Sequence, residues 1–138
     1  MTKLFHIKLQ VEKTKIDALF DSGSQANLIV ADLVKKLGLE VHDHPNPYPL
    51  GWVQKDAELK VTKQCKIRFV ISADFIVEVD LDVVPLDICG VLFGSPYMYM
   101  RDAIFMRRAN QYRLIKDRKS FIINVQKGNS KISLVSAN

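Results

Sequence analysis

Apolar and polar residues alternate along the first part of the chain, in the pattern of strands that bury one face. Within residues 5–11 every second residue is apolar, namely Phe5, Ile7, Leu9 and Val11. After a short polar break, residues 13–20 end in the apolar run Ala18-Leu19-Phe20. A period of two residues is typical of a half-buried β-strand. Because only a short polar segment separates the two runs, we predict that they form a hairpin.

Strand patterns recur through the rest of the chain at short spacing. Residues 75–84 alternate strictly, with Ile76, Glu78, Asp80 and Asp82 on one face and Val77, Val79, Leu81 and Val83 on the other. Residues 52–61 predict a second hairpin with a polar tip at 54–56, and residues 87–94 predict a buried strand that ends on glycine. Further strands are predicted at 65–71, 103–108, 112–116, 120–126 and 132–137.

Helical signals are confined to two short segments. Leu33, Val34 and Leu37 fall on one stripe and Gly38 follows them as a C-cap, which predicts a short helix within residues 26–39. Residues 95–103 are compatible with a helical turn that has proline at its first position.

The segment between the first helix and the second hairpin is rich in proline. Residues 40–51 contain Pro45, Pro47 and Pro49, and they end at Gly51. We interpret this segment as an extended, irregular connection. With few helical signals and many short strands, the sequence predicts one all-β domain with one or two short helices, a small barrel or sandwich rather than a βαβ fold.

Composition places the chain among globular proteins of one domain. Its 138 residues are 48% hydrophobic and 25% charged, which suits a single domain over residues 1–138 with a core at about 5–121 and a basic extension at about 122–138. We find no apolar run long enough to span a membrane and no signal-peptide pattern, so a cytoplasmic location is expected, whether as a free chain or as a piece of a polyprotein or particle. Cys65 and Cys89 are expected to be reduced core thiols.

The net charge of +5 comes mostly from the last third of the chain. A nucleic-acid-binding face is one interpretation of these lysines and arginines, and a solvated strand surface is the other. Only Tyr112 and Phe121 interleave with the charges, which is a weak stacking platform. We therefore favour the solvated surface and expect neither a nucleic-acid partner nor a membrane partner.

A single acidic residue ends the second predicted strand and begins a tight turn. Asp21 is followed by Ser22, Gly23 and Ser24, all of which are also ordinary turn formers. Gly23 can adopt backbone angles closed to other residues and can direct its N–H at the carboxylate. Apolar residues stand on both sides of the turn, so we expect it to be buried, where a carboxylate needs partners or takes up a proton.

Residues 18–29, ALFDSGSQANLI, resemble the active-site loop of retropepsin-like aspartic proteases, in particular those of Ty3/gypsy-type retrotransposon polyproteins. In that family an apolar strand leads into Asp-Ser/Thr-Gly, and an asparagine, two apolar residues and a short helix ending in Leu-Gly-Leu follow. Asn27, Leu28, Ile29 and residues 37–39 match this order. The second family signature is an apolar pair before a glycine, and residues 92–94, Leu-Phe-Gly, are similar to it. The resemblance covers about residues 5–121.

The resemblance implies a closed barrel of the acid-protease fold and an aspartic endopeptidase without a cofactor or metal. In such enzymes two carboxylates share one proton and activate a water. This chain has one such motif, so the resemblance implies a homodimer with an Asp21 from each subunit. Ser22, Gly23 and Ser24 would support the loop, Ser22 would link the two loops, and Gly94 would be the structural glycine of the second motif. The expected substrate is a polypeptide, a retroelement gag-pol polyprotein that the enzyme matures.

Position along the chain suggests a flap and subsites for that substrate. The flap would be residues 49–59, with Gly51 as a hinge, Trp52 as an apolar lid, and Val53 beside the tip. Trp52 is equally compatible with an ordinary core position. Leu28, Val91 and Leu92 would line the subsites, and apolar or aromatic residues would then be preferred around the cleaved bond.

Two departures from the family pattern weaken the expected dimer. Viral members often pair an acidic residue after the active loop with an arginine after the late glycine, and here these positions hold Gln25 and Ser95. Viral chains also typically close the dimer with a terminal strand, which the basic tail beyond about Arg107 could form but need not. An alternative function is a catalytically silent dimerisation or peptide-binding module with the same fold. His42 and His44 could suggest a metal, but without a further ligand we interpret them as surface residues.

Overall fold

The computed structural model describes residues 4–11, 13–52, 57–72, 75–85 and 90–125. It contains ten strands and two short helices, in an order that follows the predicted pattern closely. The strands are β1 (Leu4–Val11), β2 (Thr14–Asp21), β3 (Leu28–Val30), β4 (Val41–Trp52), β5 (Ala57–Ser72), β6 (Phe75–Val84), β7 (Val91–Phe93), β8 (Ile104–Met106), β9 (Gln111–Lys116) and β10 (Lys119–Asn124). The helices are α1 (Ala31–Leu37) and α2 (Ser95–Met100).

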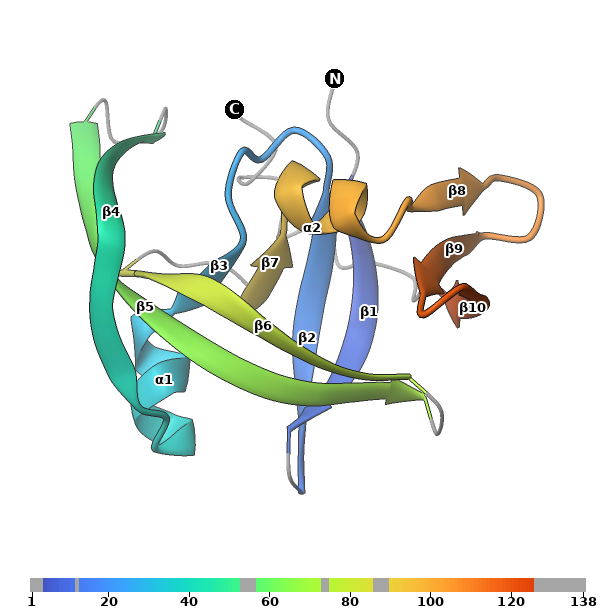
Figure 1. The fold of residues 1–138 in the computed structure, drawn as a ribbon, viewed down its shortest axis with the longest axis horizontal. Coiled ribbons are helices and arrows are strands. Elements are labelled where there is room, and N and C mark those ends of the chain that lie inside the picture. Colours follow the sequence, from blue (N-terminus) through green and yellow to red (C-terminus); the bar gives the residue numbers. More distant parts are fainter. Residues whose placement is uncertain (1–3, 12, 53–56, 73–74, 86–89, 126–138) are drawn as a thin grey trace.

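Six strands close into a barrel, which confirms the predicted all-β fold (Figure 1). The neighbours in the sheet run β1-β2-β7-β3-β6-β5, and a pairing of Gln10 with Val70 joins β5 back to β1. β1 and β2 form the expected antiparallel hairpin. The short strand β7 lies between β2, to which it is parallel, and β3, to which it is antiparallel. This places the two motif segments of the sequence side by side.

The barrel is filled by the apolar faces that the alternation predicted. Along β6, Phe75, Val77, Val79 and Leu81 are buried. Cys65, on the neighbouring strand β5, is a buried free thiol, as expected; Cys89 lies outside the described residues. Helix α1 packs Val34 inward and ends at Gly38, whose φ of +64° is the left-handed conformation of a glycine C-cap.

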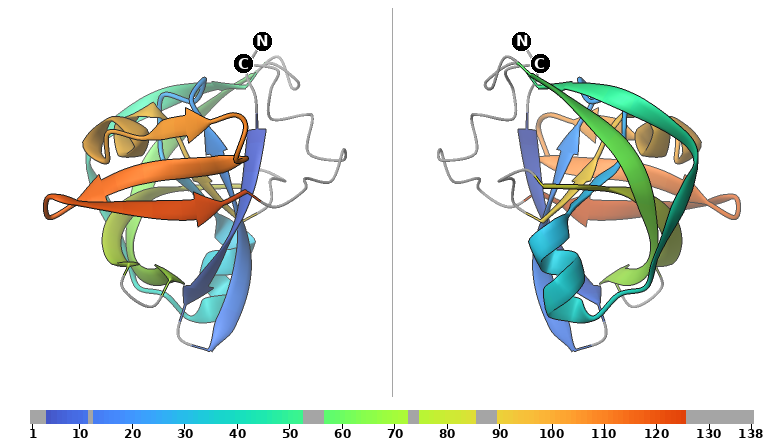
Figure 2. Two further views of the ribbon diagram at one scale, coloured as in Figure 1. Left: turned by 90° about the vertical axis from the view of Figure 1, so that its right-hand side faces the viewer. Right: turned by 90° about the vertical axis from the view of Figure 1, so that its left-hand side faces the viewer.

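A separate three-stranded sheet, β10-β9-β8, lies against one side of the barrel (Figure 2). Aromatic rings join the two parts: Phe5 packs on Phe105 with ring centroids 4.3 Å apart, and Phe75 packs on Phe121 at 4.6 Å. Offset and edge-on ring contacts of this kind stabilise a packing beyond the area they bury. The predicted strand at 132–137 lies outside the described residues.

The proline-rich segment differs from its prediction. Residues 41–52 form β4, which pairs antiparallel with β5, with a register shift between Asp43 and Tyr48. Pro45 and Pro47 fall within this shift, where no ladder hydrogen bond is required of them. β4 is the last strand of the sheet order, and an edge strand tolerates proline because one side of it needs no donor.

Helix α2 also differs slightly, since it begins at Ser95 and places proline second. Within the described part of the chain, no helix is long and apolar enough to cross a membrane.

Candidate active site

Asp21 is the last residue of β2, and the turn after it folds back onto its carboxylate. The Gly23 N–H donates to Asp21 Oδ1 at 2.9 Å, and the Ser24 N–H donates to the Asp21 carbonyl at 3.1 Å. Among the described glycines, positive φ angles occur at Gly38 and Gly90. Gly23 therefore acts through its N–H as predicted, whereas the expected unusual backbone angle is not found.

The loop is braced from within by Ser24. Its hydroxyl donates to the Ala26 carbonyl at 2.8 Å and accepts from the Ala26 N–H at 3.3 Å. Its own carbonyl accepts from the Ser95 N–H, the first residue of α2, at 2.8 Å. Ser24 is buried, so these bonds are shielded from competing water. They agree with the predicted supporting role of this residue.

Asn27 clamps the loop to the second motif. Its side-chain oxygen accepts from the Gly94 N–H at 2.9 Å and from the Tyr97 N–H at 3.3 Å. The sequence reasoning quoted Asn27 as part of the family pattern but assigned it no role. The signal was present, because a polar residue between Ala26 and the apolar pair of β3 needs a buried hydrogen-bond partner.

Gly94 is required because the loop passes directly over it. A Cβ at this position would lie 2.3 Å from the Ala26 carbonyl oxygen and 2.6 Å from the Ser24 carbonyl oxygen, well inside the 3.0 Å that real Cβ atoms keep. Both obstacles are backbone atoms that cannot rotate away. Only glycine allows the two motifs to approach this closely, which supports the structural role predicted for Gly94.

The carboxylate of Asp21 is buried and only half satisfied. The residue is 0% exposed, and Asp21 Oδ2 has no hydrogen-bond partner among the described residues. Burial raises the pKa of Asp21, and the hydrogen bond from Gly23 partly offsets this effect. The structure therefore holds an acid that binds its proton more tightly than an exposed carboxyl does and has one oxygen without a donor among the described residues.

Tyr112 is a neighbour of Asp21 that the sequence reasoning did not assign to the site. It comes from β9, and its ring packs edge-on against Phe20, with centroids 4.7 Å apart. Burial, and then the negative charge of Asp21, raise the pKa of Tyr112 to about 12. Its hydroxyl therefore stays neutral. No motif signals this contact, because β9 lies more than ninety residues further along the chain.

The predicted subsite residues have a different environment from the one expected. Leu28, Val91 and Leu92 are 3%, 0% and 1% exposed. Leu92 pairs with Leu19 on one side and with Leu28 on the other. Val91 belongs to the barrel core, whereas Leu28 and Leu92 belong to a second buried cluster that includes Leu50 and Leu59 of the β4–β5 hairpin. In the single chain these residues present no open surface, and their role in lining subsites stays a prediction.

The predicted flap corresponds to the far end of the β4–β5 hairpin. Leu50 pairs with Leu59, Gly51 with Glu58, and Trp52 with Ala57. The tip and Val53 lie outside the described residues, as do the side chains of residues 51 and 52. The hairpin is confirmed, and the hinge and lid roles stay predictions.

The surface interpretation of the two histidines holds for only one of them. His42 is exposed, whereas the His44 side chain is 11% exposed and contacts Asp82. It was missed because Asp82 is 38 residues away in the sequence, on β6, and only the pairing of β4 with β5 and of β5 with β6 brings the two together.

The closed barrel, the aspartate turn and the glycine strand beneath it together define the retropepsin-like fold. Two solved structures share it at low sequence identity. The retroviral protease-like domain of Ddi1 from Leishmania major is 10% identical, has a TM-score of 0.64 and covers 93% of this chain and 97% of its own. A retropepsin-like aspartic protease from Rickettsia conorii is 20% identical, has a TM-score of 0.51 and covers 75% and 85%.

The sequence itself defines the family more narrowly. The family model described as Ty3 transposon peptidase matches residues 1–101, and the chain belongs to this family. No curated protein matches it in sequence. The resemblance seen in the two motifs is thereby confirmed.

Proposed function

We propose that this chain is an aspartic endopeptidase that works as a homodimer, with one Asp21 from each subunit in a shared site. The observation that carries the proposal is Asp21 Oδ2, a buried carboxylate oxygen on a braced loop with no donor among the described residues. Each chain has a single Asp-Ser-Gly segment. A two-carboxylate site therefore needs a second copy of the loop, related by two-fold symmetry.

The chemistry follows from bringing two such carboxylates together. Like charges a few ångströms apart cannot both ionise, so the pair holds one proton and titrates as a unit. The ionised Asp21 takes a proton from a water, which attacks the peptide carbonyl carbon. The protonated Asp21 hydrogen-bonds to the carbonyl oxygen as negative charge develops there. The raised pKa of Asp21 supports this division, because it favours retention of the shared proton.

Two exposed residues support a contact between loops. Ser22 and Gly23 are exposed at the turn, although Asp21 beside them is enclosed. We expect Ser22 to hydrogen-bond across the two-fold axis. Gln25 and Ser95 are exposed as well and lack the charges of the viral ion pair, so we expect a weak dimer that forms where chains are concentrated, as in a polyprotein or particle in the cytoplasm. Its substrate would be that polyprotein.

One observation favours a second candidate function. Asp21 is 0% exposed in the single chain, so a substrate reaches it only if dimer formation or substrate binding opens its surroundings. A chain that never opens would be a silent dimerisation or peptide-binding module.

Cleavage of a peptide library between pH 4 and 7 distinguishes the two functions. We expect cleavage that increases with the square of protein concentration below the dimer constant, is blocked by a pepstatin-type inhibitor, and is absent in Asp21→Asn. Ser22→Ala should weaken the dimer. Absence of cleavage at concentrations where sedimentation shows a dimer would favour the module instead.

A further inference from the structure

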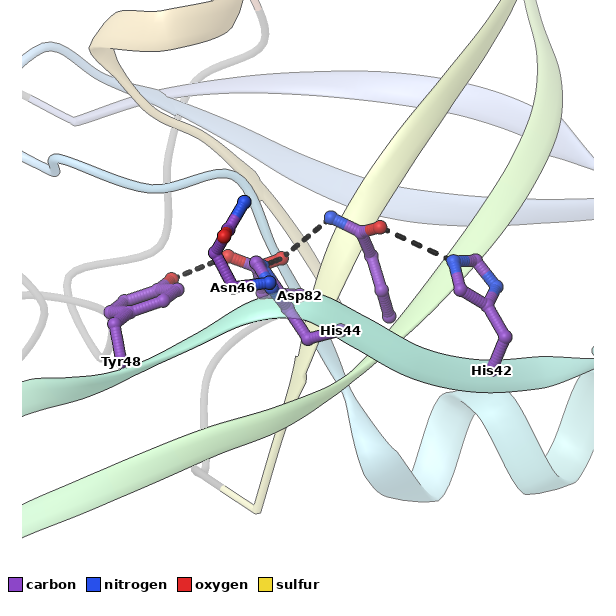
Figure 3. Close-up of polar contacts among 6 residues, drawn as sticks. His42, His44, Asn46, Tyr48 and Asp82 are labelled. Carbon is purple, nitrogen blue, oxygen red and sulfur yellow. Dashed lines mark hydrogen bonds and ion pairs between the residues drawn. The ribbon is translucent and has the colours of Figure 1, made fainter.

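A second polar cluster lies next to the active-site loop, between β4 and β6. The Asp82 carboxylate accepts hydrogen bonds from Gln64 Nε2 at 3.2 Å on Oδ1 and from the Tyr48 hydroxyl on Oδ2, and its Oδ1 lies 3.1 Å from His44 Nε2. Figure 3 shows Asp82 between Tyr48 and His44. The Asp82 side chain is only 12% exposed, so a charge here is expensive without compensation.

The hydrogen bond that His44 accepts indicates which of its two nitrogens carries the proton. Its Nδ1 accepts from the Asn46 backbone N–H at 2.9 Å, which requires a lone pair on Nδ1. The proton of a neutral imidazole must then be on Nε2, the atom that lies 3.1 Å from Asp82 Oδ1. In this form His44 directs an N–H, and no positive charge, at Asp82.

Asp82 consequently has no cationic partner in the described part of the chain. The three groups that direct an N–H or O–H at it are neutral, and no lysine or arginine pairs with it among these residues. A carboxylate offers about four acceptor positions, so about one remains on Oδ2. Burial, the hydrogen bond to Asp82 and the charge of Asp82 raise the pKa of Tyr48 above its ordinary value, as expected beside an uncompensated anion.

This carboxylate lines a pocket of about 200 Å³ that the active-site loop also lines. Gln25, Ala26 and Asn27 of the loop share the lining with His44, Tyr48 and Asp82. The volume is several times the roughly 30 Å³ that one water occupies. Asp80 also lines it, but Asp80 is exposed and lies opposite Lys66 in the neighbouring strand. Among the described residues, no group of three side chains is placed to hold a metal.

The pocket is within reach of a peptide bound at Asp21. Gln25 is four residues beyond Asp21 in the sequence, so the two are at most about 14 Å apart. An extended peptide advances about 3.3 Å per residue. A peptide cleaved at Asp21 would therefore place a side chain within about four residues of the cleaved bond over this pocket.

We propose that this pocket binds a lysine or arginine side chain of the peptide substrate, with Asp82 as its counter-ion. The proposal rests on the proposed protease function. It replaces the expectation of purely apolar subsites with a requirement for one basic residue near the cleaved bond. The cation supplies the charge that the three neutral donors of Asp82 lack, and it uses the free acceptor position on Oδ2.

The test compares paired peptides that carry either lysine or the uncharged norleucine at each of four positions on both sides of the cleaved bond. For the wild-type dimer we expect that, at one of these positions, kcat/KM is at least about tenfold higher for the lysine peptide than for the norleucine peptide. Asp82→Asn, which keeps the size of the side chain, should abolish this ratio, so that the lysine and norleucine peptides are cleaved equally well. Glu78→Gln removes the same charge from an exposed position on β6 and should retain the full ratio.

Each other outcome decides a separate point. Cleavage without a lysine preference at any position, or a preference that survives Asp82→Asn, overturns the pocket assignment and leaves the protease function standing. If no peptide is cleaved, the proposed function fails. The pocket assignment is then tested by the affinities of the Asp21→Asn variant for the lysine and norleucine peptides. Equal affinities, or no binding, overturn the pocket assignment. If Asp82→Asn does not fold, Gln64→Lys supplies an internal cation and must abolish the preference.

Discussion

Replacing Asp21 by asparagine should make the folded chain more stable at neutral pH while removing its activity. Asparagine keeps the oxygen that accepts from the Gly23 N–H. It replaces Oδ2, a buried atom without a donor among the described residues, by a neutral amide group whose burial costs less than that of a charge. The side chain at this position would then be chosen for function rather than for stability.

The magnitude follows from the state of that one oxygen. A buried acceptor left without a partner costs about 1–3 kcal/mol, and more when it is charged. For a chain of this length, 1 kcal/mol corresponds to roughly 3–5 °C in the melting temperature. The amide N–H groups of asparagine would also lack a partner here and would cost about 1–3 kcal/mol, so only the excess cost of the charge is recovered. We therefore expect Asp21→Asn to raise the free energy of unfolding by about 1 kcal/mol or more at pH 7.

The effect should depend on pH in a defined direction. The pKa of Asp21 is raised above its ordinary value of 3.8 by burial, so the folded chain binds the proton more tightly than the unfolded chain does. The stabilisation by this proton is complete below pH 3.8 and is lost as the pH rises through the folded-state pKa. The advantage of Asp21→Asn should therefore be small below pH 4 and grow toward pH 7.

The measurement is urea denaturation of both proteins between pH 3.5 and 7.5, at concentrations where sedimentation shows a monomer. Asp17→Asn is the matched control, because Asp17 lies on the same strand with its side chain 52% exposed and pairs with Lys8 at the surface. Its loss should change the free energy of unfolding by less than about 1 kcal/mol. The reasoning is refuted if Asp21→Asn is no more stable than the wild type at pH 7, or if its advantage does not change with pH.

Substitutions at three further positions test the bracing of the loop, each by denaturation. Gly94→Ala should cost about 2–5 kcal/mol, because its Cβ meets two backbone carbonyl oxygens; a loss below 1 kcal/mol would show that the loop can move aside. Asn27→Ala should cost about 2–4 kcal/mol by leaving two N–H groups without an acceptor, and Asn27→Asp, which keeps the oxygen, should cost less. Tyr112→Ala should cost about 3–5 kcal/mol and Tyr112→Phe less than about 1.5 kcal/mol, since the ring provides the contacts with Phe5 and Phe20; equal losses would contradict this.

The parts of this fold that local pattern determines could be predicted from the sequence. The β1–β2 hairpin, the alternation of β6 and the cap at Gly38 each depend on residues close together in the chain. The active-site loop was found for a similar reason, since its twelve residues are contiguous. β4 was missed because proline usually excludes a strand, and only its place at the sheet edge makes proline acceptable.

What could not be predicted depends on contacts between distant segments. Tyr112 reaches Phe20 from a separate sheet, and His44 reaches Asp82 across two intervening strand pairings. The burial of Leu92 was itself predicted, because the apolar run before Gly94 is typical of a buried strand. The residues that flank it, Leu19 and Leu28, come from other strands, and which strands lie beside β7 is a property of the sheet order.

The braced loop and its unsatisfied carboxylate are best understood together. The loop is fixed by hydrogen bonds that the Ser24 hydroxyl and the Ser95 N–H donate and that the Asn27 side-chain oxygen accepts, and Gly94 allows it to sit directly on β7. A loop held in this way cannot relax to supply Asp21 Oδ2 with a donor of its own. The same rigidity means that a second carboxylate arriving on a two-fold axis would meet the first already in position, with little reorganisation left for the reaction itself. The unfavourable free energy of the lone acid in one chain is thus the expected consequence of building half of a preorganised site.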